Sequence, residues 1–147
     1  MSIFDSFSIN ASGLTAERYR MDVISENIAN IDTTRTEDGT PYRRKLVTFE
    51  EKGKNGTFAS ALAKAKGDYI GGGVRVGKTY EDTETEMKMV YDPSHPDADE
   101  NGYVTYPNVN VITEMTDLID ASRSHEANAT AFSASKSMAV KGLEMAQ

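Results

Sequence analysis

The fold is decided by the stretch Phe4–Ile31, which reads FDSFSINASGLTAERYRMDVISENIANI and contains no proline and one glycine. Apolar side chains recur at every seventh position along it, at Phe7, Leu14, Met21 and Ile28. In a helix, residues with this spacing form a narrow seam on one side, which favours contact with another helix. A lone helix with so thin an apolar stripe is only marginally stable. The pattern therefore predicts an amphipathic helix that needs a partner.

The seam of this first helix is imperfect. Ile24 widens it, whereas Arg18 and Ser25 fall where a strict coiled coil requires apolar groups. We expect a neighbour with polar partners to accept these two residues.

A second helix is predicted from Asn110 to Met145, with Pro107 just before its start and Gly142 near its end. Alanine and serine are frequent in it, and such small side chains let helices approach closely while leaving little to bury within a lone subunit. One face of this helix carries Val111, Met115, Leu118, Ser122, Ala129, Phe132, Ala139 and Leu143. We expect the two helices to pair antiparallel.

The middle of the chain is punctuated by glycine and proline and predicts a small β-rich insert. A short helix is a candidate over Phe58–Lys66, and Gly71–Gly73 is typical of a turn into a strand. The strand candidates are Tyr42–Phe49, Val74–Val76, Met87–Tyr91 and Tyr103–Tyr106. The predicted fold class is α+β, with a helical segment at 1–32, a β-rich insert at 33–107 and a helical segment at 108–147.

Charge and composition exclude several functions. The net charge is −7, and residues 81–101 hold eight acids and one base, so the remainder of the chain is neutral. Such a surface repels phosphate backbones, which argues against nucleic-acid binding. The basic run Arg43–Lys45 is interpreted as a solvated strand face or a protein contact.

Export and membrane signals are missing from the sequence. No apolar run is long enough to span a membrane, and Met1–Asp5 has neither the basic nor the apolar region of a Sec-type signal peptide. The absence of cysteine excludes disulfides and thiolate catalysis. We therefore expect no direct membrane insertion and no cleaved signal of this type.

No motif predicts a catalytic, cofactor or metal site. Asp97–Gly102 matches the opening of an EF-hand calcium loop, but the twelfth position is Asn108, which cannot supply the bidentate carboxylate. A calcium-binding extracellular module that uses Asp97–Asn101 is the alternative function, and an acidic turn is the simpler interpretation. His95 lies in a loop between Ser94 and Pro96, and His125 lies on the second predicted helix beside Glu126, so we interpret neither as part of a metal site or a triad.

The polar stretch Ser25–Thr34 has two interpretations. Asn27 and Asn30 lie three residues apart at the end of the first helix, where asparagine tolerates the left-handed conformation and bonds free carbonyls. One interpretation is a helix C-cap, and the other is a specific corner that docks segments of neighbouring subunits. The residues alone favour neither.

The same stretch resembles the N-terminal signature of flagellar rod and hook proteins, whose A-N-x-x-T element corresponds to Ala29-Asn30 and Thr33. Within that family the chain is most similar to proximal rod proteins. The resemblance covers about 8–49 and 71–147, and 50–70 match least. Its motifs are Ser12–Ala16, Arg20–Ile24, Asn27–Thr33, Thr33–Thr36, Pro41–Lys45, Tyr91–Ala98, Gly102–Val104, Tyr106–Asn110 and Glu114–Met138.

This resemblance implies a structural subunit and not an enzyme. Such proteins leave the cell through the flagellar type III export apparatus, without a cleaved signal, and assemble in the periplasm into a rod that transmits torque. Their terminal helices pair within a subunit and pack into the tube, so the expected partners are copies of this chain, other rod proteins and the export apparatus, with no small-molecule substrate. The residues expected to pack subunits together are Phe7, Leu14, Met21, Ile24, Asn27, Ile28, Asn30, Thr33, Val111, Met115, Leu118, Phe132 and Leu143.

Overall fold

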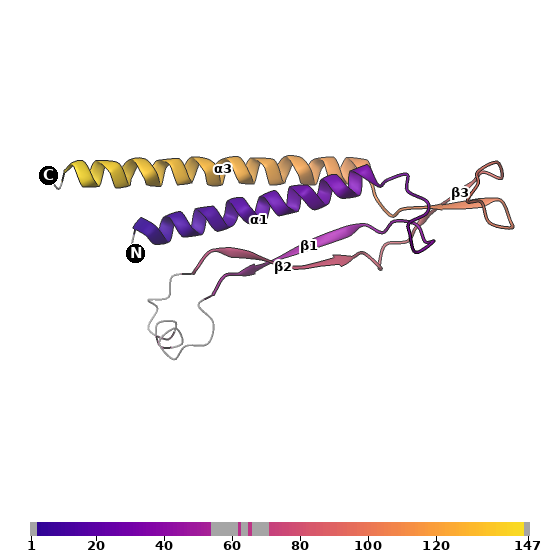
Figure 1. Ribbon diagram of the computed structural model, residues 1–147, viewed down its shortest axis with the longest axis horizontal. Helices are drawn as coiled ribbons and strands as arrows, with labels where there is room; N and C mark the ends of the chain where they lie inside the picture. Colours follow the sequence, from indigo (N-terminus) through magenta and orange to yellow (C-terminus); the bar gives the residue numbers. More distant parts are fainter. Residues whose placement is uncertain (1–2, 54–61, 63–64, 66–70, 146–147) are drawn as a thin grey trace. The chain divides into compact units, whose positions relative to one another are not determined.

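A computed structural model of the chain describes residues 3–53, 62, 65 and 71–145 (Figure 1). Two long helices flank a β-rich segment, so the predicted α+β class is confirmed. The candidate helix over Phe58–Lys66 lies almost entirely outside the described residues. The elements are α1 (Ile3–Ala29), β1 (Lys45–Glu51), β2 (Val74–Glu81), β3 (Lys88–Tyr91), β4 (Tyr103–Tyr106) and α3 (Val111–Glu144).

Both helices end within two residues of the predicted limits, and asparagines cap them. Beyond the end of α1, Asn30 donates its side-chain amide to the Glu26 carbonyl at 2.9 Å and accepts the Thr33 hydroxyl at 3.2 Å. At the start of α3, the Asn110 side chain accepts the Ile112 amide at 3.0 Å. These bonds satisfy backbone groups that a helix end leaves without partners.

The strands form two antiparallel pairs, β1 with β2 and β3 with β4. Strand β2 runs to Glu81, five residues beyond the predicted limit at Val76. The prediction was too short because Gly77, Lys78 and Thr79 interrupt the apolar alternation that marks a strand. Gly73 precedes β2 with φ of 97°, which confirms the expected turn.

The chain divides into two compact units. The first contains the chain up to Tyr19, Thr48–Gly77 and the chain from Ala121 onwards, and the second contains Arg20–Val47 and Lys78–Asp120. Each unit holds part of α1 beside part of α3, with the two helices antiparallel (Figure 1).

In the first unit, small residues bring the helices together. Ala16 and Ala121 are 2% and 0% exposed. Gly13 lies so close to Asn128 that an added Cβ would stand 2.9 Å from its side-chain oxygen. The Phe7 and Phe132 rings meet edge to face, with centroids 5.1 Å apart.

The most buried line of α1 differs from the predicted seam. It passes through Gly13, Ala16, Val23 and Asn27. The predicted seam residues Phe7, Leu14, Met21 and Ile28 are half-buried. The pattern of apolar residues in the sequence does not reveal this line, because three of its four members are a glycine, an alanine and an asparagine. The asparagine can be buried because its side-chain amide forms hydrogen bonds.

Arg18 and Ser25 lie outside the packed face of α1, and their contact with a polar neighbour stays a prediction. Both are exposed, and the Ser25 hydroxyl donates to the Met21 carbonyl of its own helix at 2.8 Å.

A buried polar corner and a candidate assembly surface

The second unit contains a buried polar corner centred on Asn27, which is 1% exposed. Its side-chain amide donates to the Lys45 carbonyl at 2.9 Å and to Glu114 Oε2 at 3.1 Å. Its oxygen accepts the Tyr42 hydroxyl and the Lys45 amide, both at 2.9 Å. An asparagine side chain has two donors and two acceptor lone pairs, so every one is used. One residue of α1 thus fixes the start of β1 and the first turn of α3.

An ion-pair group continues this corner. The Arg44 guanidinium lies 2.6 Å from Glu114 Oε1 and 3.4 Å from Asp117 Oδ2. Glu114 is 1% exposed, and burial of a carboxylate is costly unless a cation and hydrogen bonds compensate its charge. Arg20 of α1 also approaches Asp117, at 3.7 Å. The sequence favours a solvated strand face or a protein contact for the run that contains Arg44. In the structure Arg44 instead forms ion pairs with two carboxylates of α3 in its own chain.

Asn108 joins the loop after β2 to the same corner. Its oxygen accepts the Arg44 amide at 2.9 Å, and its nitrogen donates to the carbonyls of Asp82 and Thr85 at 2.9 and 3.2 Å. Asp82 in turn accepts the Thr85 amide and hydroxyl at 3.0 and 2.7 Å. Sequence reasoning missed this link, because no spacing rule joins residues 26 positions apart.

Tyr42 and Asp82 of the second unit have shifted pKa values. Burial, followed by the negative charges of Glu26, Glu114 and Glu81, raises the pKa of Tyr42 to about 12. Hydrogen bonds from the Thr85 amide and hydroxyl hold the pKa of Asp82 below its usual value. The neutral Tyr42 hydroxyl is therefore the form that donates to Asn27.

Each asparagine of the stretch Ser25–Thr34 has a distinct role in the structure. Asn30 and Thr33 form the helix cap that one interpretation required. Asn27 forms a corner, as the other interpretation required, but the segments that it joins belong to its own chain. A role for these three residues between subunits stays a prediction.

The first turns of α3 carry an apolar face that the described residues leave exposed. The exposed fractions are 77% for Ile112, 53% for Met115 and 52% for Ile119. The spacing of three and four residues places these three on one side of the helix. We call them the α3 apolar face. Exposed apolar residues gathered in this way typically mark an interaction surface.

Of the α3 apolar face, only Met115 belongs to the predicted packing residues, and the rest of that predicted set divides by burial. Ile24 and Asn27 are buried, and Val111 and Leu143 are exposed by 39% and 71%. The half-buried ones are Phe7, Leu14, Met21, Ile28, Asn30, Thr33, Leu118 and Phe132. Every predicted packing residue except Ile24 and Asn27 thus retains some exposed surface. A contact of these residues with a second subunit stays a prediction.

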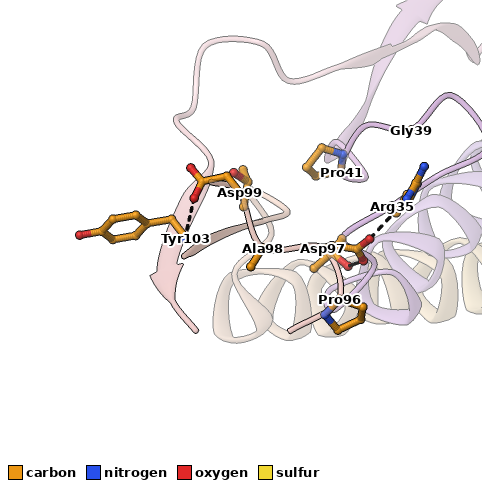
Figure 2. Close-up of a pocket in the computed structure, with 10 residues that line it drawn as sticks. Arg35, Gly39, Pro41, Pro96, Asp97, Ala98, Asp99 and Tyr103 are labelled. Carbon is orange, nitrogen blue, oxygen red and sulfur yellow. Dashed lines mark hydrogen bonds and ion pairs between the residues drawn. The ribbon is translucent and has the colours of Figure 1, made fainter. Parts of the chain in front are cut away.

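A pocket of about 350 Å³ lies beside the β3–β4 hairpin (Figure 2). In it, Asp97 accepts the Thr34 hydroxyl at 2.8 Å and faces Arg35 at 3.7 Å. Asp99 turns to its own loop and accepts the amides of Asn101 and Tyr103 at 2.9 and 2.8 Å. The two carboxylates thus serve different partners, which fits the acidic-turn interpretation, and nothing in the described residues supports the calcium alternative.

Neither histidine is part of a metal centre in the described chain, where no cluster of three or more metal-ligating side chains occurs. His95 accepts the Asp97 amide at 3.1 Å and helps to shape the loop. Within the same residues, neither helix combines the length and the apolar character that a membrane span requires.

Comparisons with known proteins identify the class. Residues 7–35 match the model of the flagella basal body rod protein family, and residues 100–145 match that of the flagellar basal body rod FlgEFG protein C-terminal region. The chain is 46% identical to flagellar basal-body rod protein FlgC of Bacillus subtilis over 99% of both chains. It is 45% identical to FlgC of Borreliella burgdorferi, over 100% of this chain and 99% of the relative. It is 38% identical to FlgC of Salmonella typhimurium over the whole of both chains.

Paired terminal helices, an exposed apolar helix face and these matches define a structural protein of the bacterial flagellar rod. Since the similarity extends over the full length, the chain belongs to the family of flagellar basal-body rod protein FlgC. The resemblance found in the sequence is confirmed.

Proposed function

We propose that this chain is a subunit of the proximal rod, which assembles by helix packing against copies of itself and other rod proteins and so transmits torque. In this proposal it crosses the inner membrane through the flagellar type III apparatus, without a cleaved signal, and acts in the periplasm. It needs no cofactor and performs no catalysis. Residues 1–32 and 108–147 form the part that packs into the tube, and 33–107 form an insert on it.

The proposal rests on the exposed α3 apolar face. This face occurs on a chain that is similar to a rod protein over its full length. Burial of apolar surface contributes about 25 cal/mol per Å². An exposed isoleucine and methionine therefore gain free energy only when a second molecule covers them. The polar corner supports the same proposal, because it fixes the end of α1 to the start of α3, and this part of the chain can dock without further ordering.

The test is a charge placed on the α3 apolar face in a strain that lacks its own copy of the gene. Ile112→Asp combined with Ile119→Asp should leave the purified chain folded by circular dichroism, because both side chains are exposed, and should abolish rod formation and swimming. Thr113→Asp combined with Ala131→Asp is the control of equal charge, since both positions are exposed and point about 100° away from Ile112. Normal rods with the isoleucine variant would contradict the proposal.

A further inference from the structure

The β3–β4 hairpin presents a second exposed surface, separate from the α3 apolar face. The register pairs Met89 with Thr105 and Tyr91 with Tyr103, so these four side chains share one side of the hairpin. Met89, Tyr91 and Tyr103 are 61%, 64% and 42% exposed, and the two tyrosine rings meet edge to face at 5.3 Å. Large apolar groups so exposed are typical of a contact surface.

Negative charge borders this hairpin surface. Tyr103 and Thr105 also line the pocket that contains Asp97 and Asp99, and Figure 2 shows the Tyr103 ring projecting away from the loop that carries Asp97. The neighbouring Glu100 is exposed. Residues 81–101 carry a net charge of −7 on an otherwise neutral chain, so a partner with apolar groups and a positive charge is complementary.

The chain itself carries a surface of that chemistry at the end of α3. In the first unit, Phe7 of α1 lies against Phe132 of α3, and the two helices are antiparallel. Ile3 lies one turn before Phe7, so it is level with the residue one turn after Phe132, which is about Lys136. The last turns of α3 thus continue beyond the described part of α1. Met138 is 66% exposed there, and Lys141 is exposed one turn later. Met145 is the residue after α3, donates its amide to the Lys141 carbonyl at 3.1 Å and is 84% exposed.

These three residues form one stripe, because spacings of three and four residues place them on the same side of a helix. We call it the α3 tail stripe. Methionine sulfur makes favourable contacts with aromatic rings, and a lysine ammonium is attracted both to tyrosine faces and to carboxylates. The two methionines and Lys141 therefore have counterparts on the hairpin surface, whereas the exposed Glu144, three residues after Lys141, has none.

We propose that the α3 tail stripe of one copy docks on the hairpin surface of a second copy. The two surfaces differ, so the contact is heterologous, and its repetition builds a ring or an open array of subunits instead of a symmetric dimer. Met138 and Met145 pack on Tyr91 and Tyr103, and Lys141 approaches Glu100. This inference rests on the proposed function and adds a specific contact between identical subunits to it.

Cross-linking between two differently tagged full-length chains tests the contact. The chain has no cysteine, so single cysteines report only on the chosen positions. Asn101→Cys in one copy and Ala134→Cys in the other should cross-link through a short bismaleimide, because Ala134 lies one turn before Met138 on the same side of α3. Asn101→Cys with Ser133→Cys is the control, since position 133 points about 100° away from the stripe. Equal yields from both pairs would overturn the proposal.

A charge swap separates a specific contact from general attraction. Lys141→Glu alone and Glu100→Lys alone should each lower the cross-link yield several-fold, and the combination of the two variants should restore it. Lys136→Glu carries the same charge change on another side of α3 and should leave the yield unchanged. Failure of the combined variants to restore the yield, or an equal loss with Lys136→Glu, would overturn the proposal.

The same variants distinguish this inference from the function on which it rests. Rods that assemble normally with Lys141→Glu would refute the docking contact and leave the rod function intact. Absence of the unaltered chain from isolated rods would instead refute the rod function.

Discussion

At the scale of single residues, Asn27 forms four hydrogen bonds and links α1, Tyr42, β1 and Glu114. A leucine of similar size would satisfy the apolar pattern of the helix better but would remove the Asn27 partner of four polar groups, two in buried and two in part-buried hydrogen bonds. The cost of such groups, roughly 1–3 kcal/mol each, exceeds what one apolar side chain gains. Asparagine is therefore the residue that this corner requires.

We expect Asn27→Ala to lower the free energy of unfolding by about 3 kcal/mol, because the Lys45 backbone and the Tyr42 hydroxyl lose their buried partner. Asn30→Ala, which removes a half-buried cap, should cost about 1 kcal/mol. Urea unfolding followed by circular dichroism measures both. Equal losses would show that Asn27 has no special place in the fold.

The Tyr42 hydroxyl gives a prediction for alkaline pH. Its pKa is raised to about 12 in the folded chain, above the ordinary value of 10.0. The contribution of the protonated Tyr42 hydroxyl to the free energy of unfolding is thus fully present below pH 10 and is lost as the pH rises through 12. Ultraviolet difference spectra should show a tyrosine ionisation step near pH 12, and Tyr42→Phe should remove that step. An unchanged titration in Tyr42→Phe would contradict the assignment.

At the scale of elements, α1 and α3 of the first unit lie close together at Gly13. An alanine in a helix is favoured over glycine by about 1 kcal/mol. Its Cβ would stand 2.9 Å from the Asn128 side chain, whose amide donates to the Ser124 carbonyl at 3.0 Å and would have to move. These two effects are similar in size and opposite in sign.

Gly13→Ala should therefore change the stability of the chain little on its own. In the Asn128→Ala background the same change should add about 1 kcal/mol, because the obstructing side chain is gone. A thermodynamic cycle from thermal or urea unfolding of the four chains measures the coupling. Additive effects would mean that the helices do not touch at this position.

The elements themselves could be predicted from the sequence, since the two helices and strand β4 follow from hydrophobic periodicity and from proline and glycine positions. The contacts between them could not. The buried line of α1 uses Gly13, Ala16 and Asn27, which an apolar count leaves out. The pairing of Arg44 with Glu114 joins residues 70 positions apart, and local patterns hold no information on such a pair. The α3 apolar face lies on predicted helix residues, but which side faces outward depends on how α1 covers α3.

At the scale of the whole molecule, the buried apolar core is small. The buried hydrophobic residues of the described chain are Ala16, Val23, Ile24, Tyr42, Val104 and Ala121. Large apolar side chains such as Ile112, Leu143 and Met145 remain mostly exposed. A chain with this distribution gains much of its burial from neighbours, as a subunit of a rod would.

We therefore expect a dilute monomer to have poorly ordered helix ends. Limited proteolysis should cut near the start of α1 and in the last turns of α3 first, and the circular dichroism signal should rise on assembly. Cleavage near the polar corner around Asn27 should be slow by comparison, because that part is fixed by hydrogen bonds from three segments. A monomer that is helical and protease-resistant to both ends would contradict this expectation.

The most direct test of the central claim is a cryo-EM map of isolated rods assembled with this chain. The account predicts that the chain is found within the rod wall, with α1 and α3 antiparallel and with Ile112, Met115 and Ile119 covered by helices of neighbouring subunits. A map in which the chain is absent from the rod, or in which these three side chains face solvent, would contradict it.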